Sequence, residues 1–171
     1  MSDAINSWEA SVTDLWERFD TLSPGAAIAE MQELADACPA RDGRADFERA
    51  GMYDAAGFEA EACTEYERAL ERGLDEARHA QLAVQYGSTL RNLGRFDEAI
   101  AILRAAPIHA STGTAPRVVL ALALHSAGKT DEALRVAIEA QIESLPQYQR
   151  SMRHYAAALT DSPTAEDSHT K

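Results

Sequence analysis

Five histidines and two cysteines are the side chains in this sequence best suited to bind a metal or to act as nucleophiles. No two histidines lie four residues apart, so no helix presents a pair of imidazoles to a metal ion. Cys38 and Cys63 are too few for a disulfide framework or a zinc site, and we expect two reduced, partly buried thiols. The histidines are His79, His109, His125, His154 and His169.

Carboxylates for acid–base catalysis are plentiful, but a solvated helix face explains them. Glu59, Glu61 and Glu65 are examples within one predicted helix. Gly87 and Gly94 lie seven residues apart inside a predicted helical hairpin and do not form a phosphate-binding loop. The residues thus contain no catalytic set, and we predict a protein without enzymatic activity, metal or cofactor.

The net charge of −12 is confined to the first half of the chain. Residues 1–78 carry 19 acidic and 7 basic side chains, a balance of −12, whereas residues 79–171 carry 9 of each. An acidic surface repels phosphate backbones, so we expect no nucleic-acid partner. Two interpretations of the acidic half stay open: a solvated face that keeps the protein soluble, or a docking surface for a basic partner.

Hydropathy and composition bear on the compartment. No apolar run approaches the roughly 20 residues that cross a bilayer, and the N-terminal residues lack the basic and apolar regions of a secretory signal. We therefore predict a cytoplasmic protein with no membrane partner. Lysine occurs only at Lys129 and Lys171, arginine and alanine are abundant, and this composition suggests a bacterial source with a GC-rich genome.

The segments that position these side chains are all predicted to be helical. Apolar residues recur at spacings of three and four, as in Trp8, Val12, Leu15 and Phe19 near the N-terminus. Glycine and proline separate the periodic segments. We predict helices over about 5–22, 24–38, 45–55, 59–73, 75–92, 97–106, 115–126, 131–143 and 146–159, with a loop at 108–114.

A short pattern occurs three times, anchored at Gly57, Gly94 and Gly128, which lie 37 and 34 residues apart. An alanine follows each glycine after five residues and another after twelve. A recurrence of this length is typical of stacked helical hairpins, in which each hairpin buries its apolar face against its neighbours.

Together with the residues before each glycine, the pattern resembles the tetratricopeptide repeat, whose 34-residue unit is a pair of antiparallel helices. The resemblance is to bacterial members of about this size. A degenerate first unit has Leu15 where the family has a small residue. The matching positions are Ala50, Tyr53, Gly57, Ala62, Tyr66 and Ala69, then Gly87, Leu90, Gly94, Ala99, Leu103 and Ala106, and finally Ala121, Leu124, Gly128, Ala133, Ala137 and Ala140.

This resemblance implies an all-α fold, a right-handed superhelical stack of antiparallel helix pairs closed by a C-terminal capping helix. Residues 1–159 would form a single domain, and residues 160–171 are expected to be a disordered tail. The units would cover about 8–41, 43–76, 80–113 and 114–146, with the cap at 147–159.

The resemblance also implies a protein or peptide partner, bound in a concave groove that the first helix of each pair lines. An alternative is that the same residues are merely the solvated inner face, with Phe47 and Val118 partly buried. The groove residues assigned by position are Arg44, Phe47, Asp54, Gln81, Gln85, Ser88, Arg91, Asn92, Val118, Leu122 and His125.

The first predicted helix suggests a second function. Its apolar stripe contains Trp8, Val12, Trp16 and Phe19. The stripe either packs on the second unit or forms an exposed self-association surface, in which case the protein is a structural homodimer.

Overall fold

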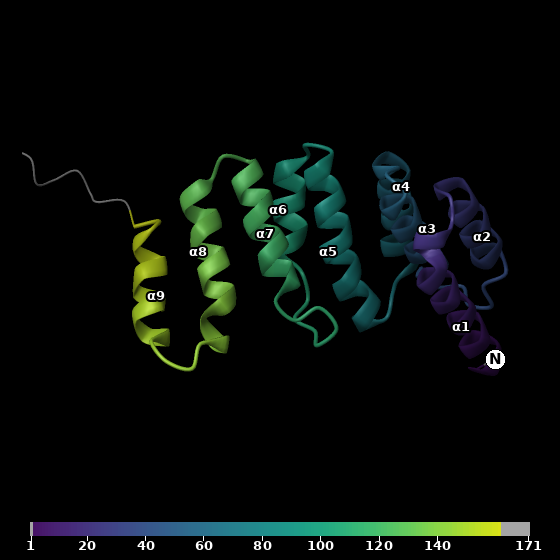
Figure 1. Ribbon diagram of the computed structural model, residues 1–171, viewed down its shortest axis with the longest axis horizontal. Helices are drawn as coiled ribbons and strands as arrows, with labels where there is room; N and C mark the ends of the chain where they lie inside the picture. The colour runs from purple at the N-terminus through teal and green to yellow at the C-terminus, as the bar shows by residue number, and fades with distance from the viewer. Residues whose placement is uncertain (1, 162–171) are drawn as a thin grey trace, which may run out of the picture.

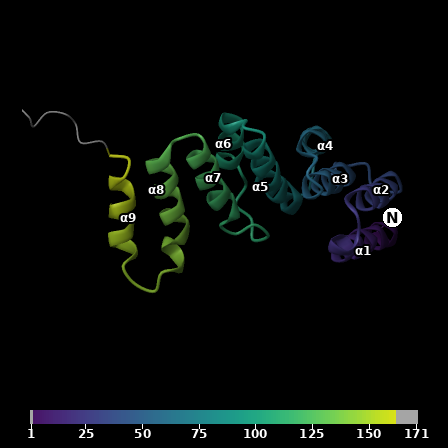
Figure 2. The same cartoon turned by 45° about the horizontal axis from the view of Figure 1, so that its top comes forward.

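The computed structural model of the chain describes residues 2–161, which form a row of helices with the α1–α2 pair at one end and α9 at the other (Figure 1). Figure 2 shows the same row turned by 45°. The elements are α1 Ser2–Arg18, η1 Phe19–Thr21, α2 Pro24–Asp36, α3 Arg44–Ala55, α4 Glu59–Arg72, α5 Glu76–Asn92, α6 Phe96–Arg104, α7 Ala115–Ser126, α8 Thr130–Gln141, η2 Ile142–Ser144 and α9 Gln149–Ala158.

Successive helices pair as hairpins, α1 with α2, α3 with α4, α5 with α6, and α7 with α8. Within residues 2–161 all regular secondary structure is helical, and no strand occurs. The prediction of an all-α helical-repeat stack is therefore confirmed. The predicted tail at 160–171 lies outside the described residues, apart from Thr160 and Asp161.

The three anchor glycines occupy equivalent places. Gly57, Gly94 and Gly128 have φ of 83°, 77° and 77°, a left-handed conformation that glycine adopts without steric cost. In each turn the residue after the glycine donates its N–H to a carbonyl five residues back, as Phe58 does to Tyr53 at 2.8 Å. The same bond recurs at 2.9 Å from Arg95 and from Lys129. This bond closes the preceding helix and reverses the chain.

The larger of two core clusters runs from α3 to α8. Tyr66 is its largest fully buried side chain, its ring centroid lies 5.5 Å from that of Tyr86, and its hydroxyl donates to Gln85 at 3.2 Å. Small residues at the repeat positions let the helices approach closely. Ala50, Ala62, Ala69 and Ala99 are completely buried there.

The second cluster packs the degenerate first unit. It contains Trp8, Val12 and Leu15 of α1, residues of α2, and Ala45 and Met52 of α3. The helix α3 therefore serves both clusters, because its residues Phe47 and Ala50 belong to the larger one.

Several predicted helix ends differ from the structure. Helix α6 ends at Arg104 and not at Ala106, because Pro107 lacks an N–H and disfavours the helical conformation at the residue before it. Helix α8 ends at Gln141, and the last helix begins at Gln149 and not at Pro146. Ala137 of α8 is exposed, so the α7–α8 pair buries no side chain at the repeat position that Tyr66 occupies in the α3–α4 pair.

We predict that Tyr66→Ala lowers the free energy of unfolding by about 2–4 kcal/mol, since it leaves a cavity between hairpins and removes a hydrogen bond. Urea unfolding followed by circular dichroism measures the loss. The matched control is Tyr155→Ala on α9, where the side chain is 59% exposed and the expected change is within about 0.5 kcal/mol. Equal losses in the two variants would contradict the burial of Tyr66.

Two helical glycines provide a second test of the packing. A methyl group on Gly87 would lie 2.6 Å from Cγ of Leu103, whereas one on Gly51 would meet nothing closer than 3.4 Å. Alanine gains about 1 kcal/mol over glycine within a helix, so we expect Gly51→Ala to be neutral or stabilising. We expect Gly87→Ala to destabilise by about 1–3 kcal/mol, because Leu103 must move. Thermal unfolding distinguishes the two, and a more stable Gly87→Ala variant would refute the close approach of α5 and α6.

Candidate functional site

The first helices of successive pairs, α1, α3, α5 and α7, lie next to one another and form what we call the first-helix face. Gly51 on α3 lies between neighbours on either side. A methyl group placed on it would be 3.4 Å from the Trp16 ring of α1 and 3.8 Å from Oε1 of Gln85 on α5. Between α5 and α7, Nε of Arg91 donates to Oγ of Ser126 at 3.0 Å.

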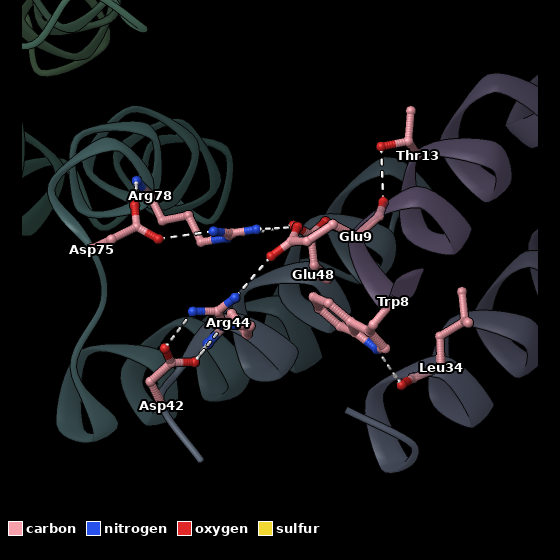
Figure 3. A network of polar contacts seen from close by, with 9 residues as sticks. All are labelled: Trp8, Glu9, Thr13, Leu34, Asp42, Arg44, Glu48, Asp75 and Arg78. Carbon is pink, nitrogen blue, oxygen red and sulfur yellow. Dashed lines mark hydrogen bonds and ion pairs between the residues drawn. The ribbon is translucent and has the colours of Figure 1, made fainter. Parts of the chain in front are cut away.

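A network of charged side chains lies at one end of this face, where α1, α3 and α5 meet (Figure 3). Glu9 of α1 accepts from Arg44 of α3 at 2.9 Å and also pairs with Arg78 of α5. Arg44 in turn pairs with Asp42 at 2.8 Å, and Arg78 with Asp75 at 2.8 Å. Because both guanidinium groups are held between carboxylates, Arg44 is engaged within the chain and is not a free contact for a partner.

A half-buried carboxylate adjoins this network. Glu48 accepts a hydrogen bond from the indole Nε1 of Trp16 at 2.9 Å and lies 3.9 Å from Nε of Arg78. Burial raises the pKa of the Glu48 carboxyl above its ordinary value, and the bond from Trp16 and the charge of Arg78 oppose the rise. The Glu48 side chain is only 12% exposed and contributes mainly to the cohesion of α1, α3 and α5.

The structure corrects the assignment of Phe47 to a groove. Its side chain is 5% exposed and belongs to the larger core cluster, because it faces the inside of the stack rather than the face. Asp54, on the same helix, is half-buried and accepts from the hydroxyl of Thr89 at 2.9 Å. Burial raises the pKa of Asp54 above its ordinary value.

The α5 part of the face is polar and carries little charge. Gln81, Gln85 and Ser88 are half-buried, and Gln85 accepts the Tyr66 hydroxyl bond. At the end of the helix, Nη1 of Arg91 donates to Oδ1 of the exposed Asn92 at 3.2 Å. Arg91 and Asn92 are thus in contact with each other, but Arg91 is also bonded to Ser126 of α7.

The α7 part of the face carries apolar side chains. Val118 and Leu122, one helical turn apart, are 42% and 47% exposed, and His125 is also exposed. Of the predicted groove residues, those on α5 and α7 therefore form the accessible part, whereas Arg44, Phe47 and Asp54 are engaged or buried.

The self-association stripe is not available at the surface. Trp8 and Val12 are 5% and 4% exposed, and the indole of Trp8 donates to the Leu34 carbonyl of α2 at 2.7 Å. Trp16 and Phe19 are half-buried and pack against the same cluster. The stripe is covered by α2 and α3 because an amphipathic helix at the start of a stack has neighbours on its apolar side. The prediction that Trp8 and Val12 are exposed for self-association is therefore wrong, and the homodimer itself stays a prediction.

Glu9, Glu48 and Arg78 were not predicted as site residues. The acidic first half was interpreted as either a solvated face or a docking surface for a basic partner, although several of its carboxylates pair with arginines of other helices. Helical spacing places such residues on a face but does not show which charges on neighbouring helices meet. A charge-pairing pattern among Glu9, Arg44 and Arg78 is visible only once the helices are placed.

Residues 2–161 also bear on metal, membrane and thiol chemistry. No group of three or more His, Cys, Asp or Glu side chains there is placed to hold a metal ion. None of the helices in this range combines the length and apolarity that a membrane span requires. Cys38 and Cys63 are free thiols, and burial raises the pKa of both.

A protein-family model described as tetratrico peptide repeat matches residues 43–159, which are most of the chain but exclude the degenerate first unit. No curated protein matches. No solved structure matches either.

The burial of Glu48 predicts a pH dependence. Because its pKa is raised in the folded state, its neutral form contributes stability below its unfolded pKa, and this contribution is lost as pH rises through the folded pKa. Glu48→Gln keeps an acceptor for Trp16 and does not titrate. We expect the stability of the wild type, relative to Glu48→Gln, to fall as pH rises above the ordinary pKa of a glutamate.

Urea titrations followed by tryptophan fluorescence measure this difference. Glu61→Gln, at an exposed position on α4, is the control, and its stability relative to the wild type should stay level over the same range. If the stability difference between the wild type and Glu48→Gln were also independent of pH, the burial of this carboxyl would be contradicted.

Proposed function

Since this chain belongs to the tetratricopeptide repeat family, whose repeats are in general protein-interaction modules, we propose that it binds a peptide or protein segment across the α5–α7 part of the first-helix face. The proposal includes a non-catalytic role and a cytoplasmic, bacterial setting.

One observation carries the proposal: an apolar pair on α7 is exposed beside a neutral polar surface on α5. Val118 and Leu122 are each more than two-fifths exposed, whereas Leu120 and Leu124 of the same helix are buried. Exposed apolar side chains that gather on one face are typical of partner-binding surfaces. An extended segment would place an apolar side chain against this pair.

The neighbouring α5 residues suit the backbone of such a segment. Amide and hydroxyl groups, here Gln81, Ser88 and Asn92, donate and accept hydrogen bonds without the desolvation cost of a charge. Because Arg44 and Asp54 are already satisfied by other groups of the chain, the proposed contact surface begins at α5 and not at α3.

The chain contains a matched pair of leucines that tests this assignment. Leu122 on α7 and Leu134 on α8 are 47% and 49% exposed, and they lie on the two helices of one hairpin. Proteins retained by the immobilised full chain from a bacterial lysate are identified by mass spectrometry, and the affinity of a purified hit is then measured for each variant.

We expect Leu122→Ala to weaken that affinity about tenfold, because truncating a central apolar contact typically costs more than 1 kcal/mol. We expect Leu134→Ala to leave the affinity unchanged. Equal affinities for both variants and the wild type would place the binding elsewhere and overturn the proposal.

A further inference from the structure

Helix α6 is shorter than its counterparts, and its early end opens a hollow in the stack. It has 9 residues, whereas α4 has 14 and α8 has 12. Pro107 prevents its continuation, and residues 105–114 connect it to α7 as a loop without regular helix. The loop lies at the same edge of the stack as the connection between α8 and α9 (Figure 1).

The hollow beside this loop has a volume of about 560 Å³ and a lining that is apolar over more than half of its area. Leu103, Pro107, Pro116 and Leu120 contribute to its walls. Ile108 also lines it and is 99% exposed, an unusual position for a large aliphatic side chain. A volume of this size and an apolar lining are typical of ligand sites in proteins.

Positive charge is placed at the same hollow. Arg104 and Arg117 both line it, and Glu132 of α8 pairs with Arg104. Arg117 is exposed and forms no ion pair with any residue of the described range, although the carboxylate of Glu143 lines the same hollow. The hollow therefore contains one guanidinium group whose charge is not matched within residues 2–161.

The start of α7 adds to this positive potential. Helices α4, α6 and α8 each carry two acidic residues in the first turn, which complement the partial positive charge of the helix N-terminus. Helix α7 has none in its first turn, and Arg117 stands there instead. Gly113 and Thr114, immediately before the helix, line the hollow.

The hollow continues toward α9. A second hollow of about 390 Å³ shares Arg117 and Glu143 with the first and is also lined by Arg135, Ile142 and Arg153. Arg135 is bonded to Glu139 at 2.8 Å and to Thr160 at 2.7 Å. The two hollows form an elongated cleft from α6 to α9, which we call the edge cleft, and this length suits a chain segment better than a small compact molecule.

We propose that the edge cleft binds an acidic peptide segment of a partner protein, with a large aliphatic side chain in the apolar hollow and a neighbouring carboxylate at Arg117. The carboxylate supplies the opposite charge that Arg117 does not find within residues 2–161, and the aliphatic group covers Ile108 and Leu120. This site lies at the edge where helix pairs connect and is separate from the surface of Val118 and Leu122.

Three short peptides, each titrated into the full ¹⁵N-labelled chain, test which chemical groups the edge cleft recognises. The first is acetyl-Glu-Leu-Glu-amide. The second, acetyl-Gln-Leu-Gln-amide, keeps shape but removes charge, and the third, acetyl-Glu-Ser-Glu-amide, keeps charge but removes the aliphatic group. We expect saturable NMR shift changes at Gly113, Thr114 and Arg117 with the first peptide, and at least fivefold weaker binding of the other two.

Two variants and one control test the residues. Arg117→Gln should weaken binding of the first peptide about tenfold and abolish its preference over the neutral peptide. Ile108→Ser, at a fully exposed position that folding does not require, should weaken binding of both leucine peptides and leave the serine peptide unchanged. Arg150→Gln removes an exposed arginine of α9 that lines neither hollow, and it should bind like the wild type.

Each contrary outcome overturns the proposal in a distinct way. Equal binding of the charged and neutral peptides would show that Arg117 does not select a carboxylate. Shift changes confined to α5 and the Val118 side of α7 would assign peptide binding to the first-helix face alone. Absence of saturable changes anywhere at millimolar peptide would exclude this ligand class, and the test of Leu122 would be unaffected.

Discussion

The close approach of neighbouring helices is the constraint on which this structure depends. Helix pairs approach because alanines fill the positions between them, and because Gly87 leaves room for the side chain of Leu103. Tyr66 and Tyr86 then fill the larger space where two hairpins meet. A side chain one methyl group larger at such a position separates two helices, and that separation affects every residue on the first-helix face that they position.

The sequence was sufficient for the fold because the repeat depends on local features. Gly57, Gly94 and Gly128 adopt the same backbone conformation and close their helices with the same hydrogen bond, so a glycine with an alanine five residues later predicted the hairpin correctly. Helix ends were less accurate. Pro107 ended α6 earlier than the apolar spacing indicated, since steric exclusion before a proline outweighs helix propensity.

The candidate site was predictable only in part. Spacing placed Val118, Leu122 and Asn92 correctly on an accessible face, because a residue's place on a helix surface follows from its number. Spacing did not reveal that Phe47 is buried, or that Arg44 is held by Glu9 and Asp42, because these properties depend on which helices are neighbours. Likewise, a stripe with two tryptophans is equally compatible with an exposed face and with the buried side of a terminal helix.

The two core clusters meet in α3, and the charged network of Glu9, Arg44 and Arg78 joins the same region from the surface. The first helix pair is therefore attached to the rest by apolar packing on one shared helix and by partly buried ion pairs. A change in α3 therefore affects both the N-terminal hairpin and the remaining array, because this helix belongs to both clusters.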